Sequence, residues 1–204
     1  MTDPASPEPG SLVLVRHGET SWSRSGRHTG LTDVPLTEQG KEEARSLRTL
    51  LAHRRFALVL TSPLTRARRT AELAGLPTAQ VEDRLVEWDY GAYEGLTTPQ
   101  IRERLGHPWT VFTDGVVAGG TPGETIEAVA ARARAVLERA LPALVHGDVA
   151  LVGHGHCLRV LASVFLRQEP RLGAHLKLDP GSVSLLGHEH ETPAIERWNL
   201  TAGT

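Results

Sequence analysis

Two short segments of the sequence carry residues that could bind and attack an anionic group. Arg16 and His17 follow an apolar run at residues 12–15, and His154 lies between two glycines after a second apolar run. A guanidinium fork matches the oxygens of a phosphate group, so an anion is the natural ligand of Arg16. The same cation disfavours protonation of the neighbouring imidazole, which keeps His17 neutral and able to act as a nucleophile.

Two further residues complete a set suited to transfer of such a group. We expect Arg66 one turn into a helix that Ser62 caps and Pro63 opens, where the helix dipole favours anions and a second guanidinium fork could bind one. The leaving group also needs a proton donor, and Glu87 is the candidate. The glycines beside His154 let the backbone approach a bound anion closely.

Each of these signals has a simpler explanation when it is taken singly. Arg66, with Arg68 and Arg69, could form a solvated helix face, and Glu87 could be an ordinary surface carboxylate. A lone histidine after a strand is usually structural. Their joint occurrence favours a site for a phosphate group.

The histidine pairs leave two other kinds of site to consider. His154 with His156, and His188 with His190, have the His-x-His spacing that could direct two imidazoles at one metal ion. No carboxylate ligand accompanies them in a recognisable pattern, so we expect no metal. The glycines around His154 lack the third glycine of a dinucleotide-binding fingerprint, which excludes that interpretation.

Buried strands and amphipathic helices alternate along the chain. Apolar runs at residues 12–15, 57–60 and 149–152 are typical of strands buried on both faces. Helices are expected after Thr37, over 62–74, after 121 and over 158–166, with weaker strands at 183–186 and 194–198. This order predicts a three-layer α/β sandwich, whose mostly parallel central sheet is covered by helices on both faces. The ligand site then lies beyond the carboxyl ends of the strands, where residues 16–18, 61–62 and 153–156 converge.

Composition limits the classes of protein to which the chain could belong. The 204 residues include 22 Lys and Arg against 24 Asp and Glu, a near balance that argues against a nucleic-acid partner. No apolar run approaches the roughly 18 residues that would span a membrane. Cys157 is the only cysteine, which fits a reducing compartment, so we expect a cytoplasmic protein.

The length favours one domain. Residues 1–10 are proline-rich and acidic, and are expected to form a flexible arm rather than a signal peptide. Residues 11–204 are then the single domain, with 97–120 as an irregular excursion that covers the site. A homo-oligomer is possible.

The segment LVRHGET at residues 14–20 resembles the signature of the histidine phosphatase superfamily, also called phosphoglycerate mutase-like. The resemblance continues in the family's order through residues 36–40, 62–67, 87–95, 122–125 and 152–155. It implies a phosphohistidine on His17, a phosphate pocket of Arg16, Arg66 and His154, and Glu87 as proton donor. It also implies that no metal or other cofactor takes part.

A narrower resemblance comes from residues 21–30 and 87–95, which are similar to bacterial broad-specificity acid phosphatases and to fungal sedoheptulose-1,7-bisphosphatase. Most relatives have asparagine where this chain has Ser23. The substrate contacts that this resemblance implies are Ser23, His28, Thr29, Gly30, Tyr90, Gly155, Arg159 and His188, with His190 as the alternative to His188.

The resemblance implies a metal-independent phosphomonoesterase that acts on small phosphorylated metabolites, above all sugar phosphates or bisphosphates. Two alternatives stay open. One is a cofactor-dependent phosphoglycerate mutase, which returns the phosphoryl group to its substrate. The other is a non-catalytic module that binds phosphoproteins.

Overall fold

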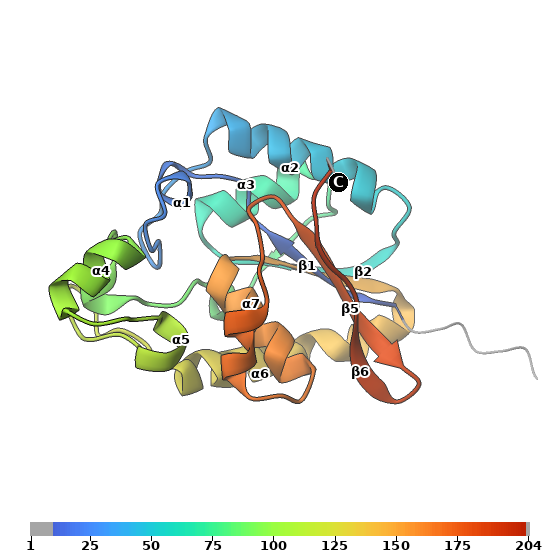
Figure 1. Cartoon of the computed structure of the whole chain (residues 1–204). Helices are drawn as coiled ribbons and strands as arrows, with labels where there is room; N and C mark the ends of the chain where they lie inside the picture. The colour runs from blue at the N-terminus through green and yellow to red at the C-terminus, as the bar shows by residue number, and fades with distance from the viewer. Residues whose placement is uncertain (1–9, 203–204) are drawn as a thin grey trace, which may run out of the picture.

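A six-stranded sheet runs through the computed structural model, which describes residues 10–202 (Figure 1). Its strand order is β3-β2-β4-β1-β5-β6. The strands are β1 (Leu12–Arg16), β2 (Phe56–Thr61), β3 (Gln80–Val81), β4 (Asp148–Gly153), β5 (Val183–Glu189) and β6 (Thr192–Leu200). The first four are mutually parallel, whereas β5 runs antiparallel to both β1 and β6. The predicted mostly parallel sheet is therefore confirmed.

Helices cover both faces of this sheet. Figure 1 shows α2 (Glu38–Leu51) and α3 (Thr65–Leu73) above it, and α6 (Ile126–Ala140) and α7 (Gly155–Phe165) below it. Alternate side chains of β1 face the two layers: Val13 and Val15 pack in the cluster of α2 and α3, whereas Leu12 and Leu14 pack with α6 and α7. This period of two is the geometry of a strand buried on both sides. The predicted three-layer sandwich is confirmed.

Residues 97–120 are more regular than the sequence suggested. They contain α4 (Thr98–Leu105) and α5 (Val111–Asp114), and α4 begins with a capping box in which Thr97 and Gln100 bond each other's backbone. Trp109 and Phe112 are buried in a third apolar cluster that includes Trp88. Burial of these aromatic rings fixes the excursion against the segment that carries Glu87.

Three helices begin at other residues than expected. Helix α6 begins at Ile126 with Thr125 as its N-cap, not directly after 121. The other two differences concern the site. Helix α3 starts at Thr65. The Ser62 hydroxyl accepts from the Leu64 amide (3.3 Å) and pairs with His154, and Asp33 accepts a hydrogen bond from the Thr65 amide (2.9 Å). Helix α7 starts at Gly155, three residues earlier than predicted. The expected cap of α2 is confirmed, since the Thr37 hydroxyl accepts from an amide of its first turn.

Shorter elements connect the layers. They are α1 (Ser21–Arg24) and 3-10 helices at Asp83–Leu85, Gly91–Tyr93, Leu141–His146 and Pro170–His175. The predicted arm lies outside the described residues except for Gly10, whose amide donates to the Leu144 carbonyl (2.8 Å). None of the helices within residues 10–202 has the length and apolar character needed to cross a membrane.

Candidate active site

The ends of β1 and β4 meet at His17. Its backbone amide donates to the Gly153 carbonyl (3.0 Å), and its buried ring places Nδ1 2.7 Å from the Gly18 carbonyl. A carbonyl only accepts, so Nδ1 carries the proton, and no hydrogen bond within residues 10–202 uses the lone pair of Nε2. Burial, then Arg66 and Arg16, lower the pKa of His17 well below its usual value. The structure therefore presents a neutral imidazole suited to nucleophilic attack.

Arg16 offers an unused donor beside that ring. One terminal nitrogen donates to the Leu178 carbonyl, whereas Nε is buried and has no hydrogen-bond partner among residues 10–202. A buried donor without an acceptor is costly, so a group that supplies one gains affinity. Gly155 makes room for this guanidinium, because a Cβ there would lie 3.2 Å from the Arg16 Cζ atom.

Arg66 and His154 form a buried pair behind His17. Arg66 Nε donates to His154 Nδ1 (3.1 Å), so the neutral His154 carries its proton on Nε2 and donates to the Ser62 hydroxyl (2.7 Å). The rings of His154 and His17 meet edge-on, with centroids 5.1 Å apart. Burial, with Arg66 as the next cause, also lowers the pKa of His154.

The remaining donors of Arg66 hold a loop in place. They bond the carbonyls of Thr32 (2.8 Å), Thr29 (3.2 Å) and Gly30 (2.8 Å). Glu94 completes this arrangement by accepting from the Gly30 amide through both oxygens and from the Thr32 amide. Glu94 was not among the predicted site residues, since a single glutamate in a loop carries no local signal of such a role.

Three backbone amides hold the carboxylate of Glu87. Its Oε1 accepts from Trp88 and Cys157 (both 2.8 Å) and its Oε2 from His156 (3.0 Å). The amides of His156 and Cys157 belong to the first turn of α7, so the carboxylate lies at the positive end of that helix. The early start of α7 thus fixes the orientation of Glu87.

These residues surround a cavity of about 180 Å³. It is lined by Arg16, His17, Ser23, Gly26, Arg27, His28, Thr29, Glu87, Tyr90, Gly155, His156 and Arg159. Three guanidinium groups against one carboxylate make the lining cationic, which favours an anionic ligand. Arg66 and His154 stand next to His17 but do not line the cavity.

Comparison with known proteins fits this geometry. Residues 12–201 match the family model of the histidine phosphatase superfamily, branch 1. The chain belongs to this superfamily. The resemblance stated from the motifs is confirmed, and so is the expectation of a phosphatase-type enzyme.

Individual relatives cover most of the chain. An acid phosphatase of Mycobacterium tuberculosis is 41% identical over 192 residues, which cover 93% of this chain and 92% of that protein. Sedoheptulose 1,7-bisphosphatase of Saccharomyces cerevisiae is 34% identical, covering 75% of this chain and 66% of its own. The solved structure of an open reading frame from M. tuberculosis has a TM-score of 0.88 at 38% identity, covering 95% and 98% of the two chains. Phosphoglycerate mutases are also among the relatives.

Three of the outer contacts expected for this histidine phosphatase have other partners already. The Ser23 hydroxyl lines the cavity but forms the capping box of α1 with the backbone of Thr20. Gly30 does not line the cavity, because its carbonyl points to Arg66. Arg159 lines the cavity while its guanidinium bonds the Gly173 and Ala174 carbonyls (2.7 and 3.0 Å).

His156 is a cavity residue. The sequence placed it in the segment 153–156 that converges on the ligand site, but suggested a role for it only as a metal ligand. Its Nδ1 lies 2.5 Å from the Tyr90 hydroxyl, and its ring stacks on His28 with centroids 5.9 Å apart. Burial lowers the pKa of His28 to about 4, and that of His156 well below its usual value. The sequence signal that could have identified it is its position two residues after His154, directly behind the third buried strand.

His188 is placed incorrectly by the sequence prediction. Strand β5 runs antiparallel to β1, with Val183 opposite Val15 and Leu186 opposite Leu12. The last residues of β5 therefore lie beside the first residues of β1, at the end of the strands away from the active site. His188 is exposed there and packs on Phe165, and His190 lies in the adjoining hairpin turn.

The same geometry bears on the two His-x-His pairs. They lie at opposite ends of the strands, and both nitrogens of His154 already have partners. Within residues 10–202, no group of three or more His, Cys, Asp or Glu side chains is arranged to hold a metal ion.

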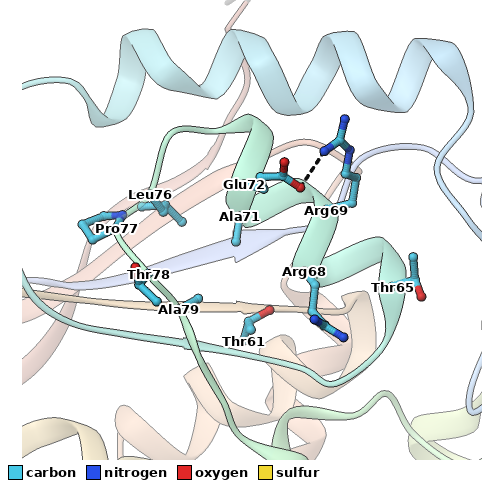
Figure 2. Close-up of a pocket in the computed structure, with 10 residues that line it drawn as sticks. All are labelled: Thr61, Thr65, Arg68, Arg69, Ala71, Glu72, Leu76, Pro77, Thr78 and Ala79. Carbon is cyan, nitrogen blue, oxygen red and sulfur yellow. Dashed lines mark ion pairs between the residues drawn. The ribbon is translucent and has the colours of Figure 1, made fainter.

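Two further cavities are of interest: one adjoins the active site, and the other lies apart from it. One of about 230 Å³ lies under α4 and α5 and shares His28, His156 and Arg159 with the active-site cavity. A larger one, about 580 Å³, lies between α3 and residues 76–79, with Arg68 and Thr61 in its wall (Figure 2). None of the predicted site residues lines that larger cavity.

Proposed function

We propose that this histidine phosphatase hydrolyses phosphomonoesters of small metabolites, without a metal, through a phosphohistidine on His17. The observation that supports the proposal is that two groups occur side by side in the sequence: a neutral His17 whose Nε2 has no partner, and a buried Arg16 Nε that also has none within residues 10–202. A phosphate oxygen supplies the acceptor that Arg16 lacks. The phosphorus atom then lies beside the nucleophile, and positioning and charge stabilisation are what phosphoryl transfer chiefly requires.

The reaction has two steps. His17 Nε2 attacks phosphorus in line, the bond from phosphorus to the ester oxygen breaks, and protonated Glu87 gives its proton to the departing alkoxide. A water molecule then attacks the phosphohistidine and gives its proton to the Glu87 carboxylate. The bond from phosphorus to nitrogen breaks, which releases phosphate and restores His17. Arg66, from behind, disfavours a protonated His17 in the resting enzyme.

Sugar phosphates, and bisphosphates in particular, are the substrates that we propose. A cavity of about 180 Å³ leaves little space beyond the phosphate group, so the organic part must extend further. The adjoining cavity offers Trp109 and Phe112 for ring stacking, and Arg102 and Arg159 for a second anion. Similarity to an acid phosphatase and to a sugar bisphosphatase supports this substrate class.

Trapping of the intermediate tests the mechanism. Rapid quenching should yield an acid-labile, alkali-stable phosphoenzyme in the wild type and none in His17→Ala. The variant should retain less than about a hundredth of the rate, by comparison with the usual contribution of one catalytic group. A His17→Ala protein with more activity than this would refute the covalent mechanism.

Product analysis separates the alternatives. With 3-phosphoglycerate as substrate, release of free phosphate is expected from a phosphatase, whereas formation of 2-phosphoglycerate would show a mutase. A protein that neither releases phosphate nor forms 2-phosphoglycerate, but binds a phosphoprotein, would instead be a phosphoprotein-binding module.

A further inference from the structure

Arg132 on α6 contacts both segments that hold Glu87. One terminal nitrogen, NH1, donates to the Arg84 carbonyl (2.8 Å) and to the Val86 carbonyl (2.7 Å), which belongs to the peptide bond that leads into Glu87. The same nitrogen lies 3.2 Å from the Cys157 sulfur. Cys157 in turn donates its amide to Glu87 Oε1. A single guanidinium group thus joins the backbone of Glu87 to the helix end that receives its carboxylate.

A carboxylate fixes this guanidinium in a single orientation. Glu124 accepts from Arg132 through two parallel bonds, Nε to Oε1 (2.9 Å) and NH2 to Oε2 (3.1 Å). Glu124 Oε2 also accepts from the Asp89 amide (3.0 Å), and the Glu124 carbonyl accepts from the Trp88 indole (2.8 Å). The ion pair therefore holds the chain on both sides of Glu87. Only 12% of the Arg132 side chain is exposed, so water does not replace these bonds easily.

The Cys157 thiol acts here as a neutral acceptor. Burial raises its pKa to about 11, so its sulfur carries no charge at neutral pH. Its contact with Arg132 adds to the contacts that set the distance between α6 and the first turn of α7. No reaction of the thiol is needed for this role.

We propose that the Arg132–Glu124 ion pair is a positioning device for the proton donor of the reaction. It holds Glu87 where its carboxyl reaches the leaving-group oxygen, although neither Arg132 nor Glu124 lines the active-site cavity. This inference rests on the proposed role of Glu87. A shift of about 1 Å in a catalytic group is enough to cost a hundredfold in rate. Loss of the pair should therefore slow phosphorylation of His17 by an alkyl ester, which needs a proton donor, more than phosphorylation by an aryl ester. Hydrolysis of the phosphohistidine, which also uses Glu87, is common to both.

Arg139 supplies a matched control on the same helix. Seven residues further along α6, it bonds Glu82 (2.6 Å) and Gln80 (2.6 Å), and so holds the same connecting segment further from Glu87. Arg139→Lys should disturb packing of this segment without moving the proton donor. Arg132→Lys keeps the positive charge but loses the fork that reaches five acceptors.

The experiment compares two leaving groups. We would measure kcat and KM of Arg132→Lys, Glu124→Gln and Arg139→Lys with an alkyl substrate, glucose 6-phosphate, and with p-nitrophenyl phosphate, whose phenolate leaves without protonation. Arg132→Lys and Glu124→Gln should lower kcat/KM, which reports the first step, about tenfold or more for the alkyl ester beyond their effect on the aryl ester. Arg139→Lys should affect both esters alike. The double variant Arg132→Lys/Glu87→Gln should be no slower on the alkyl ester than Glu87→Gln alone, because coupled groups are not additive.

The variant Glu87→Gln distinguishes a failure of the positioning role from a failure of the proposed mechanism. If Glu87→Gln discriminates between the esters but Arg132→Lys and Glu124→Gln do not, the positioning role is wrong and the proposed function stands. Additive losses in the double variant would also overturn it. If Glu87→Gln lowers kcat/KM equally for both esters, Glu87 is not the proton donor, and the proposed mechanism falls together with this inference.

Discussion

Replacement of Arg66 by lysine should destabilise the protein strongly, although the charge is kept. The guanidinium spreads four hydrogen bonds over His154 Nδ1 and the carbonyls of Thr29, Gly30 and Thr32. A lysine ammonium concentrates its three donors at one point and cannot reach all four acceptors. If it keeps two, the two lost bonds cost about 1.5 kcal/mol each, because the donor is charged. We therefore expect a loss of about 3 kcal/mol in the free energy of unfolding.

Urea unfolding followed by tryptophan fluorescence and far-UV circular dichroism measures this loss. For a chain of this size, 3 kcal/mol lowers Tm by about 6–12 °C. Arg68→Lys is the control on the same helix, since Arg68 is exposed and its side chain makes no hydrogen bond or ion pair within residues 10–202. Its effect should stay within about 0.5 kcal/mol.

Activity gives a second measure of the same substitution. Lysine leaves His154 and the loop at 29–32 less well held, so kcat/KM should fall for every phosphomonoester, aryl and alkyl alike. An Arg66→Lys protein that unfolds at the same urea concentration as Arg68→Lys would refute the reasoning, because the four bonds would then contribute nothing that an ammonium does not replace.

Three further results are expected. Arg159→Ala should raise KM several-fold for a sugar bisphosphate but spare p-nitrophenyl phosphate, since binding remote from phosphorus is lost; equal effects would refute a second anion site. Burial lowers the pKa of His28 to about 4, so between pH 6.5 and 4 the unfolded chain binds a proton that the folded chain does not. Stability falls as pH falls through this window, and His28→Gln should make that fall shallower by up to about 1.4 kcal/mol per pH unit; an unchanged slope would contradict this. A chelator should leave the rate unchanged while vanadate inhibits, and inactivation that zinc reverses would show a metal enzyme.

The positions of the central strands along the chain could be predicted from sequence because the signal of a buried strand is local. A run such as Leu12 to Val15 is apolar at every position, which only a strand covered on both faces requires. Parallel strands end at one edge of the sheet, so the residues that follow them had to meet there. The proximity of His17, Ser62 and His154 follows from this rule. No detail of side-chain packing was needed.

The direction of β5 and the exact start of α7 could not be predicted in this way. Antiparallel pairing of β5 with β1 places His188 at the end of the strands away from the active site. An apolar run does not indicate in which direction its strand will pair. The first turn of α7 delivers two amides to a carboxylate about 70 positions earlier in the chain. Arg132 likewise bonds carbonyls of Arg84 and Val86, which carry no sequence signal because every residue has a carbonyl. Such contacts between distant segments depend on how helices pack on the sheet. The sequence by itself determined that the residues at the strand ends, such as His17, Ser62 and His154, meet, but not what holds them there or which outer residues reach the cavity.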